Sequence, residues 1–449
     1  MLGNFKSRLL SGNARTIAVK KNILSSAFLK GVNILTSFML VPLTIGYVSS
    51  ELYGIWLTLS SIMSWLGFFD IGFTQGLKNK LTEAIARNDW KRGKELVSTT
   101  YFMMIVIFVP ICLLLELLVP HIHWTSLLNV DFSYEATIQK VMYALIAFFC
   151  IQMIINVIVS VVAAFQKVAL SSSFNTIGQV LALIIVYILT KTVPPSLLSL
   201  AIAVSVAPIV VVIIASVILY SSSYKDIAPS FDAISLSHAK DIFSLGYKFF
   251  IINIQVVVLY QSTNILISNV SSPLDVTSYN IAYKYLNVAM MVYTIITAPL
   301  WPAYTDAYVK KDFAWMRSVR NKMTEVFLLS AFACVVMLLV SGDVYRIWIG
   351  NKAVIPWEMT ALVALYVIVY CWMNLNATIL VGMGIVKIET ILVVAGMVIH
   401  IPLSLFLSKY FGAYGVLISM IAINLMYAVV FNIQVVKVLG QKAKGIWLQ

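Results

Sequence analysis

Charge is scarce in this chain. Only 11% of its 449 residues are Asp, Glu, Lys or Arg, and 61% are hydrophobic, whereas soluble domains carry about 25% charged residues. A soluble chain of this length divides into roughly two or three hydrophobic cores, each under a polar surface. Lipid covers apolar surface directly, so the deficit of charge excludes an ordinary soluble fold and predicts an integral membrane protein.

Acidic residues, cysteine and histidine are also few, with 18 Asp and Glu, four Cys and four His. No HExxH, CxxC, GxSxG or P-loop pattern occurs. His121 and His123 lie close together but have no third ligand nearby, and we interpret His400 as a satisfied buried polar group. The cysteines lie inside apolar runs and are typical of small buried hydrophobes: Cys112, Cys150, Cys334 and Cys371. We therefore expect no enzyme activity, no cofactor and no metal site.

The apolar runs are long enough to cross a bilayer many times. A membrane-spanning helix needs roughly 20 apolar residues. The sequence predicts twelve such helices, at residues 22–48, 52–73, 97–119, 137–164, 172–191, 196–220, 246–270, 276–304, 322–341, 355–382, 386–408 and 412–437. The fold class expected is therefore all-α integral membrane, with no room for a soluble domain between spans.

The lysines and arginines follow a membrane topology. The net charge is +13, but the basic residues cluster in short links, and no polar segment combines them with aromatics as a nucleic-acid groove requires. With the N-terminus in the cytoplasm, 24 of the 31 basic residues lie on the cytoplasmic side and four on the outer side. This positive-inside bias predicts a multi-pass inner-membrane protein with both termini cytoplasmic and no nucleic-acid partner.

The chain also repeats itself weakly. Residues 50–55 open the second predicted span and residues 277–281 open the eighth, and each span is followed by a basic link with an acid before an aromatic, at 87–90 and 310–313. Because six spans per half is an even number, the halves share one orientation in the membrane. We expect an N-terminal lobe at 1–220, a cytoplasmic link at 221–245 and a C-terminal lobe at 246–449.

Polar side chains follow one face of several predicted spans. On the first span, Lys30 and Asn33 share a face with Ser26 and Ser37, because residues three and four apart align on a helix. The same spacing groups Asn253, Tyr260, Asn264 and Ser268 on the seventh span, Asn280, Lys284, Asn287 and Thr294 on the eighth, and Gln152, Asn156 and Ser160 on the fourth. A lysine inside a span costs about 3 kcal/mol on insertion scales and usually faces water or a partner. We expect a hydrated cavity shared by the two lobes.

This cavity would suit an anionic cargo, because a buried positive charge needs a counter-ion and lysine binds phosphate well. The candidate substrate-binding residues are Lys30, Asn33, Asn253, Tyr260, Asn280, Lys284 and Asn287. Glu116 and Asp70 are candidates for ion or proton coupling, although an interfacial or capping role explains each of them as well. Two simpler interpretations stay open: Lys30 reaches the lipid headgroups, and the Asn and Ser stripes only hold helices together.

The most specific segments lie between Lys21 and Asp89. They read FMLVPL at 38–43, YGIW at 53–56, FDIGF at 69–73 and GL at 76–77. These segments, with the layout of the whole chain, resemble the polysaccharide transporters. These are the Wzx-type flippases of O-antigen and other lipid-linked oligosaccharides, in the multidrug/oligosaccharidyl-lipid/polysaccharide exporter (MOP) superfamily.

The resemblance implies a MATE-like fold of two six-helix lobes related by pseudo-two-fold symmetry, working by alternating access. It implies the transfer of undecaprenyl-pyrophosphate-linked oligosaccharide from the cytoplasmic to the periplasmic leaflet, with membrane lipids and the glycan polymerase machinery as partners. Members of the family use basic residues for the diphosphate, which suits Lys30 and Lys284. The second lobe has no arginine within a predicted span, so this chain departs from any pattern that needs one there.

Three alternatives stay open. A multidrug/cation antiporter of the same superfamily shares the fold but uses buried carboxylates, where this chain has basic groups. A lipid II flippase is close in chemistry but resembles proteins with more spans than the twelve predicted here. An integral-membrane glycan polymerase or acyltransferase needs a large outer loop or a cluster of His, Asp and Glu, and the sequence has neither.

Overall fold

The computed structural model describes residues 14–66, 73–237, 261–297 and 300–448, and every regular element in these ranges is a helix. Nine described helical segments are long and apolar enough to cross a membrane: Phe28–Val48, Trp90–His121, Phe132–Ala164, Ala169–Thr192, Leu197–Ser221, Phe313–Leu339, Trp357–Gly382, Lys387–Phe411 and Ala413–Leu439. Each overlaps a predicted span. The prediction of an all-α membrane fold is confirmed.

The other three predicted spans have separate explanations. Helix α3 (Ser50–Leu66) has only 17 residues in the described range, and most of the span predicted at 246–270 lies outside the described residues. Helix α13 (Pro273–Thr297) has 25 residues, but a polar face that includes Lys284 makes it less apolar than the nine. The polar face of α13 therefore both makes it a candidate binding helix and separates it from the nine more apolar segments.

The chain forms two compact units. Unit 1 holds residues 1–49, 62–125 and 131–254, and unit 2 holds 50–61, 126–130 and 255–449. Helix α3 and the short α6 (Trp124–Leu128) are divided between the two units. The other helices of unit 1 are α2 (Ala14–Val48), α4 (Phe73–Ala86), α5 (Trp90–Leu118), α7 (Glu135–Ile155), α8 (Val157–Ala164), α9 (Val168–Thr192) and α10 (Leu197–Ser221). Those of unit 2 are α12 (Ser262–Val270), α13, α14 (Leu300–Val309), α15 (Phe313–Leu339), α16 (Ser341–Trp348), α17 (Trp357–Gly382), α18 (Lys387–Phe411) and α19 (Ala413–Leu439). The lobe boundaries at 220 and 246 stay a prediction.

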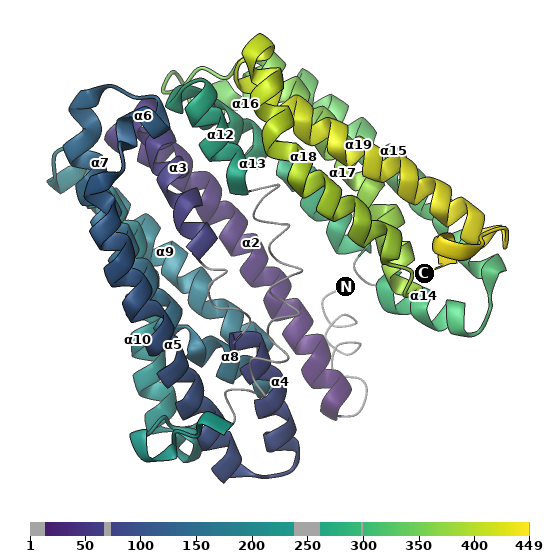
Figure 1. Cartoon of the computed structure of the whole chain (residues 1–449), viewed down its shortest axis with the longest axis horizontal. Helices are drawn as coiled ribbons and strands as arrows, with labels where there is room; N and C mark the ends of the chain where they lie inside the picture. The colour runs from purple at the N-terminus through teal and green to yellow at the C-terminus, as the bar shows by residue number, and fades with distance from the viewer. Residues whose placement is uncertain (1–13, 67–72, 238–260, 298–299, 449) are drawn as a thin grey trace, which may run out of the picture. The chain divides into compact units, whose positions relative to one another are not determined.

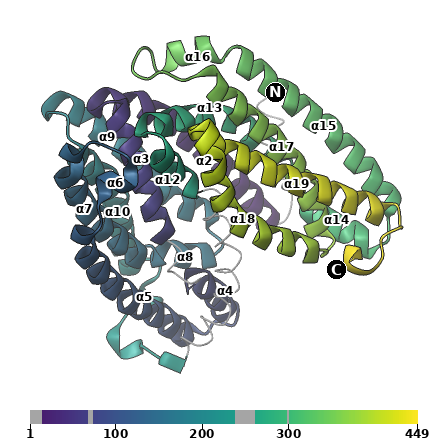
Figure 2. The ribbon, with the colours of Figure 1, turned by 45° about the horizontal axis from the view of Figure 1, so that its top comes forward.

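Each unit is a bundle with its own central helices. In unit 1, α9 packs against α2 and α10, and α7 packs against α10 and α5 (Figure 1). In unit 2, α17 packs against α13, α15 and α19 (Figure 2). The apolar stretches of α17 and α19 are 61% and 56% buried, whereas that of α15 is 6% buried. Because lipid tails accept apolar side chains as readily as a protein core does, α15 is suited to face lipid.

A nine-residue segment occurs once in each unit with the same local structure. Residues 82–90 read TEAIARNDW, and residues 305–313 read TDAYVKKDF. Asp89 caps the start of α5 and Asp312 caps the start of α15, each accepting a hydrogen bond at 3.0 Å from the backbone N–H three residues later. The residue before each aspartate has a positive φ, 55° and 58°. The repeat is therefore structural as well as sequential.

The threonine that opens each segment ties two helices together. Thr82 in α4 donates to the carbonyl of Ala164 at the end of α8 at 3.2 Å, and Thr305 in α14 donates to the carbonyl of Gly382 at the end of α17 at 2.7 Å. Each bond satisfies a carbonyl that a helix end leaves without an intrahelical partner. The sequence repeat predicted only the last four residues of this segment, and the threonine contact was missed.

Candidate functional site

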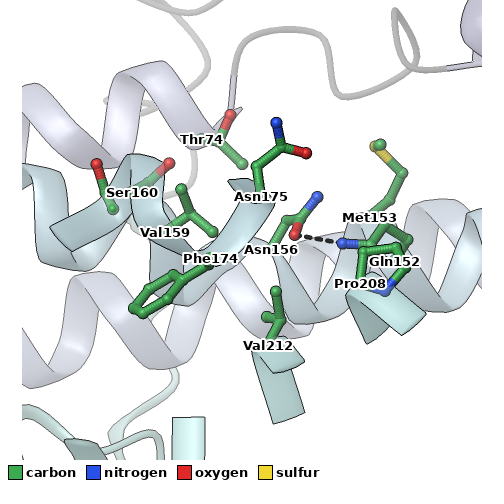
Figure 3. A pocket seen from close by; sticks show the side chains of 11 residues that line it. Thr74, Gln152, Met153, Asn156, Val159, Ser160, Phe174, Asn175, Pro208 and Val212 are labelled. Atoms are coloured by element: carbon green, nitrogen blue, oxygen red, sulfur yellow. Dashed lines mark hydrogen bonds between the residues drawn. The ribbon is translucent and has the colours of Figure 1, made fainter. Parts of the chain in front are cut away.

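Unit 1 contains a cavity of about 440 Å³, which we call cavity 1, among α4, α7, α8, α9 and α10 (Figure 3). None of the described residues that line it is ionisable. The polar ones are Thr74, Gln152, Asn156, Ser160, Ser171 and Asn175. The stripe predicted on the fourth span therefore faces this cavity within unit 1, whereas a cavity shared by the two lobes stays a prediction.

Asn156 shapes one wall of cavity 1. Helix α7 ends at Ile155 and α8 begins at Val157, so this asparagine interrupts what would otherwise be one helix. The Nε2 of Gln152 donates to the Oδ1 of Asn156 at 2.7 Å, the bond drawn in Figure 3. The Oε1 of Gln152 is buried and has no hydrogen-bond partner among the described residues. Such an oxygen costs about 1–3 kcal/mol unless water or a ligand satisfies it.

Helices α9 and α10 form the facing wall. The two helices approach closely at Gly178, which has no side chain. A Cβ added there would lie only 2.8 Å from the Cα of Pro208. Asn175 and Ser171, earlier on α9, face cavity 1. Sequence reasoning missed both, although their spacing of four residues repeats the pattern that was recognised on other spans. The four-residue spacing of Ser171 and Asn175 on α9 was visible in the sequence, but neither residue is charged, unlike the lysines on the first and eighth spans.

Unit 2 contains a smaller cavity of about 170 Å³, cavity 2. Its polar wall includes a hydrogen-bonded chain of two amides and one hydroxyl from three helices. The Nδ2 of Asn280 donates to the Oδ1 of Asn264 at 2.8 Å, and the Nδ2 of Asn264 donates to the Oγ of Ser61 at 2.8 Å. Gln261 and Met420 also line this cavity. The predicted stripes of the seventh and eighth spans therefore meet at Asn264 and Asn280.

Tyrosines form the other wall of cavity 2. Tyr279 and Tyr283 stack with ring centroids 5.7 Å apart, and Tyr283 lies 6.4 Å from Tyr366 of α17. Tyr370 continues the row, 6.0 Å from Tyr366. A row of tyrosines therefore runs from α13 onto α17.

The remaining α13 candidates continue the face of Asn280. Lys284 follows by four residues and Asn287 by three more, so all three align on one side of the helix. Both side chains are half-buried. The Oδ1 of Asn287 is buried without a hydrogen-bond partner among the described residues. This face therefore combines one ammonium group with an unsatisfied amide oxygen.

Helix α2 shows a similar pair in unit 1. The Lys30 side chain is exposed, and Asn33, three residues later, is half-buried. The Oδ1 of Asn33 is buried and has no hydrogen-bond partner within the described ranges. Exposure of Lys30 fits both a water-lined face and contact with lipid headgroups, so its role stays a prediction.

The other candidates are placed as follows. Glu116 on α5 is half-buried, and its Oε1 lies 3.7 Å from the Sγ of Cys112. Asp70, Asn253 and Tyr260 lie outside the described residues. The described residues contain no group of three or more His, Cys, Asp and Glu that could hold a metal ion.

His400 on α18 is buried as expected, but only partly satisfied. Its Nδ1 lies 3.1 Å from the Oγ of Ser419. Its Nε2 has no hydrogen-bond partner among the described residues. His121 and His123 are exposed.

The chain is similar to proteins of a known family. The family model described as "Polysaccharide biosynthesis protein" matches residues 19–307, which is more than half of the chain. A protein of Salmonella typhi named as an O-antigen transporter is 21% identical over 427 residues, covering 93% of this chain and 94% of that one.

Solved structures of transporters share the fold. An inward-facing multidrug resistance MATE family transporter of the MOP superfamily matches with a TM-score of 0.74 at 12% identity, over 91% of this chain and 96% of that chain. A MOP superfamily transporter from Pyrococcus furiosus, whose binding pocket is described as having reverse polarity, matches with a TM-score of 0.61 at 14% identity over 98% of both chains. The MATE-like fold predicted from the sequence is confirmed, and the chain belongs to the polysaccharide biosynthesis protein family.

Proposed function

We propose that this protein moves an undecaprenyl-pyrophosphate-linked oligosaccharide from the cytoplasmic to the periplasmic leaflet by alternating access. Family membership supports a polysaccharide-related cargo, and the full-length relative named as an O-antigen transporter supports transport. The observation that carries the proposal is the α13 face of Asn280, Lys284 and Asn287, which presents a cation and amides on one side of a half-buried helix.

The charge on this face selects the cargo. An ammonium group inside a membrane protein is stabilised by an anion, and a diphosphate offers several acceptor oxygens to a lysine. Asn287 lies one turn after Lys284 and would bind the phosphate oxygens or the first sugar through its amide N–H groups. The N–H groups of Asn280, one turn before Lys284, already bond to Asn264 and Val276, so Asn280 would hold the shape of this face. Lys30 of unit 1 stays a candidate for binding a diphosphate.

The lining of the cavities argues against a drug/cation antiporter. Such transporters need a carboxylate to bind a cation, and no Asp or Glu is among the described residues that line cavity 1 and cavity 2. Glu116, the one candidate carboxylate in the described ranges, lies in a different part of unit 1, on α5. The coupling role of Glu116 and Asp70 remains part of the proposal.

Topology completes the proposal. The 24 basic residues on one side of the predicted spans support a topology with both termini in the cytoplasm of a bacterial cell. The protein would then receive its cargo at the cytoplasmic leaflet of the inner membrane and release it beside the polymerase machinery that consumes it.

Deletion of the gene tests this function in the cell. We expect the deletion strain to lose its surface glycan and to accumulate the lipid-linked oligosaccharide, because an unflipped intermediate cannot reach the polymerase. Expression of the wild-type chain should restore the glycan. Intact surface glycan in the deletion strain, or a deletion that changes drug sensitivity alone, would favour the antiporter instead.

A further inference from the structure

We propose that cavity 1 is a binding site for an uncharged sugar residue of the cargo, separate from the lysine-bearing face of α13. This inference rests on the proposed function, and it assigns the carbohydrate part of the cargo to unit 1. Three features of the molecule support this site: the size of cavity 1, the chemistry of its wall and the unsatisfied side-chain oxygen of Gln152.

Size distinguishes the two cavities. Sites for small molecules usually enclose about 300–1,000 Å³. Cavity 1, at about 440 Å³, lies inside that range, whereas cavity 2, at about 170 Å³, lies below it. Cavity 1 is therefore the better candidate for holding a whole ring rather than the edge of one.

The wall of cavity 1 matches a sugar and mismatches a phosphate. Three amides and three hydroxyls line it, and its lining in the described part of the chain holds no ionisable residue. Amides and hydroxyls both donate and accept hydrogen bonds, as the hydroxyl groups of a sugar do. A diphosphate placed here would meet no cation among these residues, and an uncompensated charge away from water is costly. The site therefore favours an uncharged polyol.

One wall of cavity 1 also offers a hydrogen-bond acceptor, the side-chain oxygen of Gln152. Because Gln152 donates to Asn156 at 2.7 Å, its own carbonyl oxygen is turned away from that bond and is left without a partner among the described residues. A sugar hydroxyl would satisfy this oxygen. Phe174, which also lines the cavity, provides the flat apolar face on which the C–H side of a sugar ring packs, in the manner of aromatic residues that line ligand sites.

Asn175 comes from the facing wall. Figure 3 shows its side chain and that of Asn156 projecting into the same cavity from α9 and from the α7–α8 break. Two amides from different helices fix the positions of two hydroxyls at once. This arrangement selects for the stereochemistry of a sugar rather than for general polarity.

Binding to purified protein in lipid nanodiscs tests the assignment. Two probes are compared by calorimetry: undecaprenyl diphosphate without sugar, and the lipid-linked oligosaccharide isolated from the deletion strain. We expect Gln152→Ala and Asn175→Ala each to weaken binding of the sugar-bearing lipid by about five- to tenfold, the loss of one or two hydrogen bonds. Both variants should bind the sugar-free lipid as the wild type does.

Two controls keep the outcomes separate. Gln139→Ala removes a glutamine of the same helix that lies outside cavity 1 and bonds to Glu135, and it should bind both lipids normally. Lys284→Ala should weaken binding of both lipids, because it acts on the diphosphate. Equal weakening of both lipids by the cavity variants, or no weakening of either, would overturn the sugar site.

The proposed function fails in a different way. If Lys284→Ala binds both lipids normally while the cavity variants lose only the sugar-bearing one, the diphosphate assignment is wrong and the sugar site stands. Wild-type protein that binds neither lipid would overturn both proposals.

Discussion

Replacement of Lys284 by alanine should reduce surface glycan to the level of the gene deletion, without reducing the amount of protein in the membrane. The ammonium group sits on a half-buried helix face between Asn280 and Asn287. A hydrogen bond between charged groups contributes about 1.5–3 kcal/mol, so its loss weakens diphosphate binding roughly 10- to 100-fold. Glycan immunoblotting and membrane immunoblotting of the same cells measure the two quantities.

Two variants bracket this result. Lys284→Arg keeps the positive charge and should retain most of the glycan, since a guanidinium also binds phosphate. Lys140→Ala removes an exposed lysine near the start of α7 and should have no effect. Normal glycan in Lys284→Ala, at normal protein levels, would remove this residue from the binding site.

Replacement of Gly54 by valine should prevent unit 2 from folding. A Cβ at this position would lie 1.8 Å from the backbone oxygen of Pro273. That backbone has little freedom to move, because Thr277 donates to the carbonyl of Ser50 at 2.6 Å and fixes the start of α13 against the start of α3. Overpacking of this kind costs about 1–3 kcal/mol even when flexible side chains adjust, and here the obstacle is main chain.

A glycine in open surroundings provides the matched control. Nothing lies within 4 Å of a Cβ added to Gly31 on α2, so Gly31→Ala should be tolerated or slightly stabilising, by about 0.5–1 kcal/mol. Size-exclusion profiles and thermal unfolding in detergent measure both variants. A Gly54→Val protein as stable as the wild type would show that α3 and α13 do not approach as closely as described.

The sequence predicted the helices well because burial in lipid imposes a strong and simple pattern. Each of the nine spanning segments is an apolar run of sufficient length, and hydropathy alone finds it. Helix α13 was predicted for the same reason, and its polar face marked it as a candidate for binding. The polar side chains that make α13 a candidate binding helix therefore also lower its hydropathy.

Pairings between helices were harder to predict. The stripe of Gln152 and Asn156 was recognised, but its partner Asn175 was not, because which helix faces the break at Asn156 depends on tertiary packing rather than on spacing. The same limit hid the threonine contact of Thr82 with Ala164, although the nine-residue repeat that contains it was partly visible. Matching whole segments between the halves would have found it.

The contacts of the link after α10 could not be predicted from the sequence either. The sequence predicts a cytoplasmic connection from residue 221, but its first part is fixed to α5. The backbone N–H of Ser230 donates to the Oγ of Ser98 at 3.0 Å, and that of Ser235 donates to the Oγ1 of Thr99 at 2.9 Å. A serine followed by a threonine on a predicted span gives no sign of such a role, because these residues usually bond to their own helix.

Reconstituted transport tests most directly whether the Lys284 ammonium group binds a lipid diphosphate as it crosses the membrane. Purified protein in liposomes should move an undecaprenyl-pyrophosphate-linked oligosaccharide from one leaflet to the other, as measured by its accessibility to a membrane-impermeant lectin. The rate should fall to that of protein-free liposomes in Lys284→Ala. Transport at the wild-type rate by that variant, or no transport by the wild type, would contradict the account.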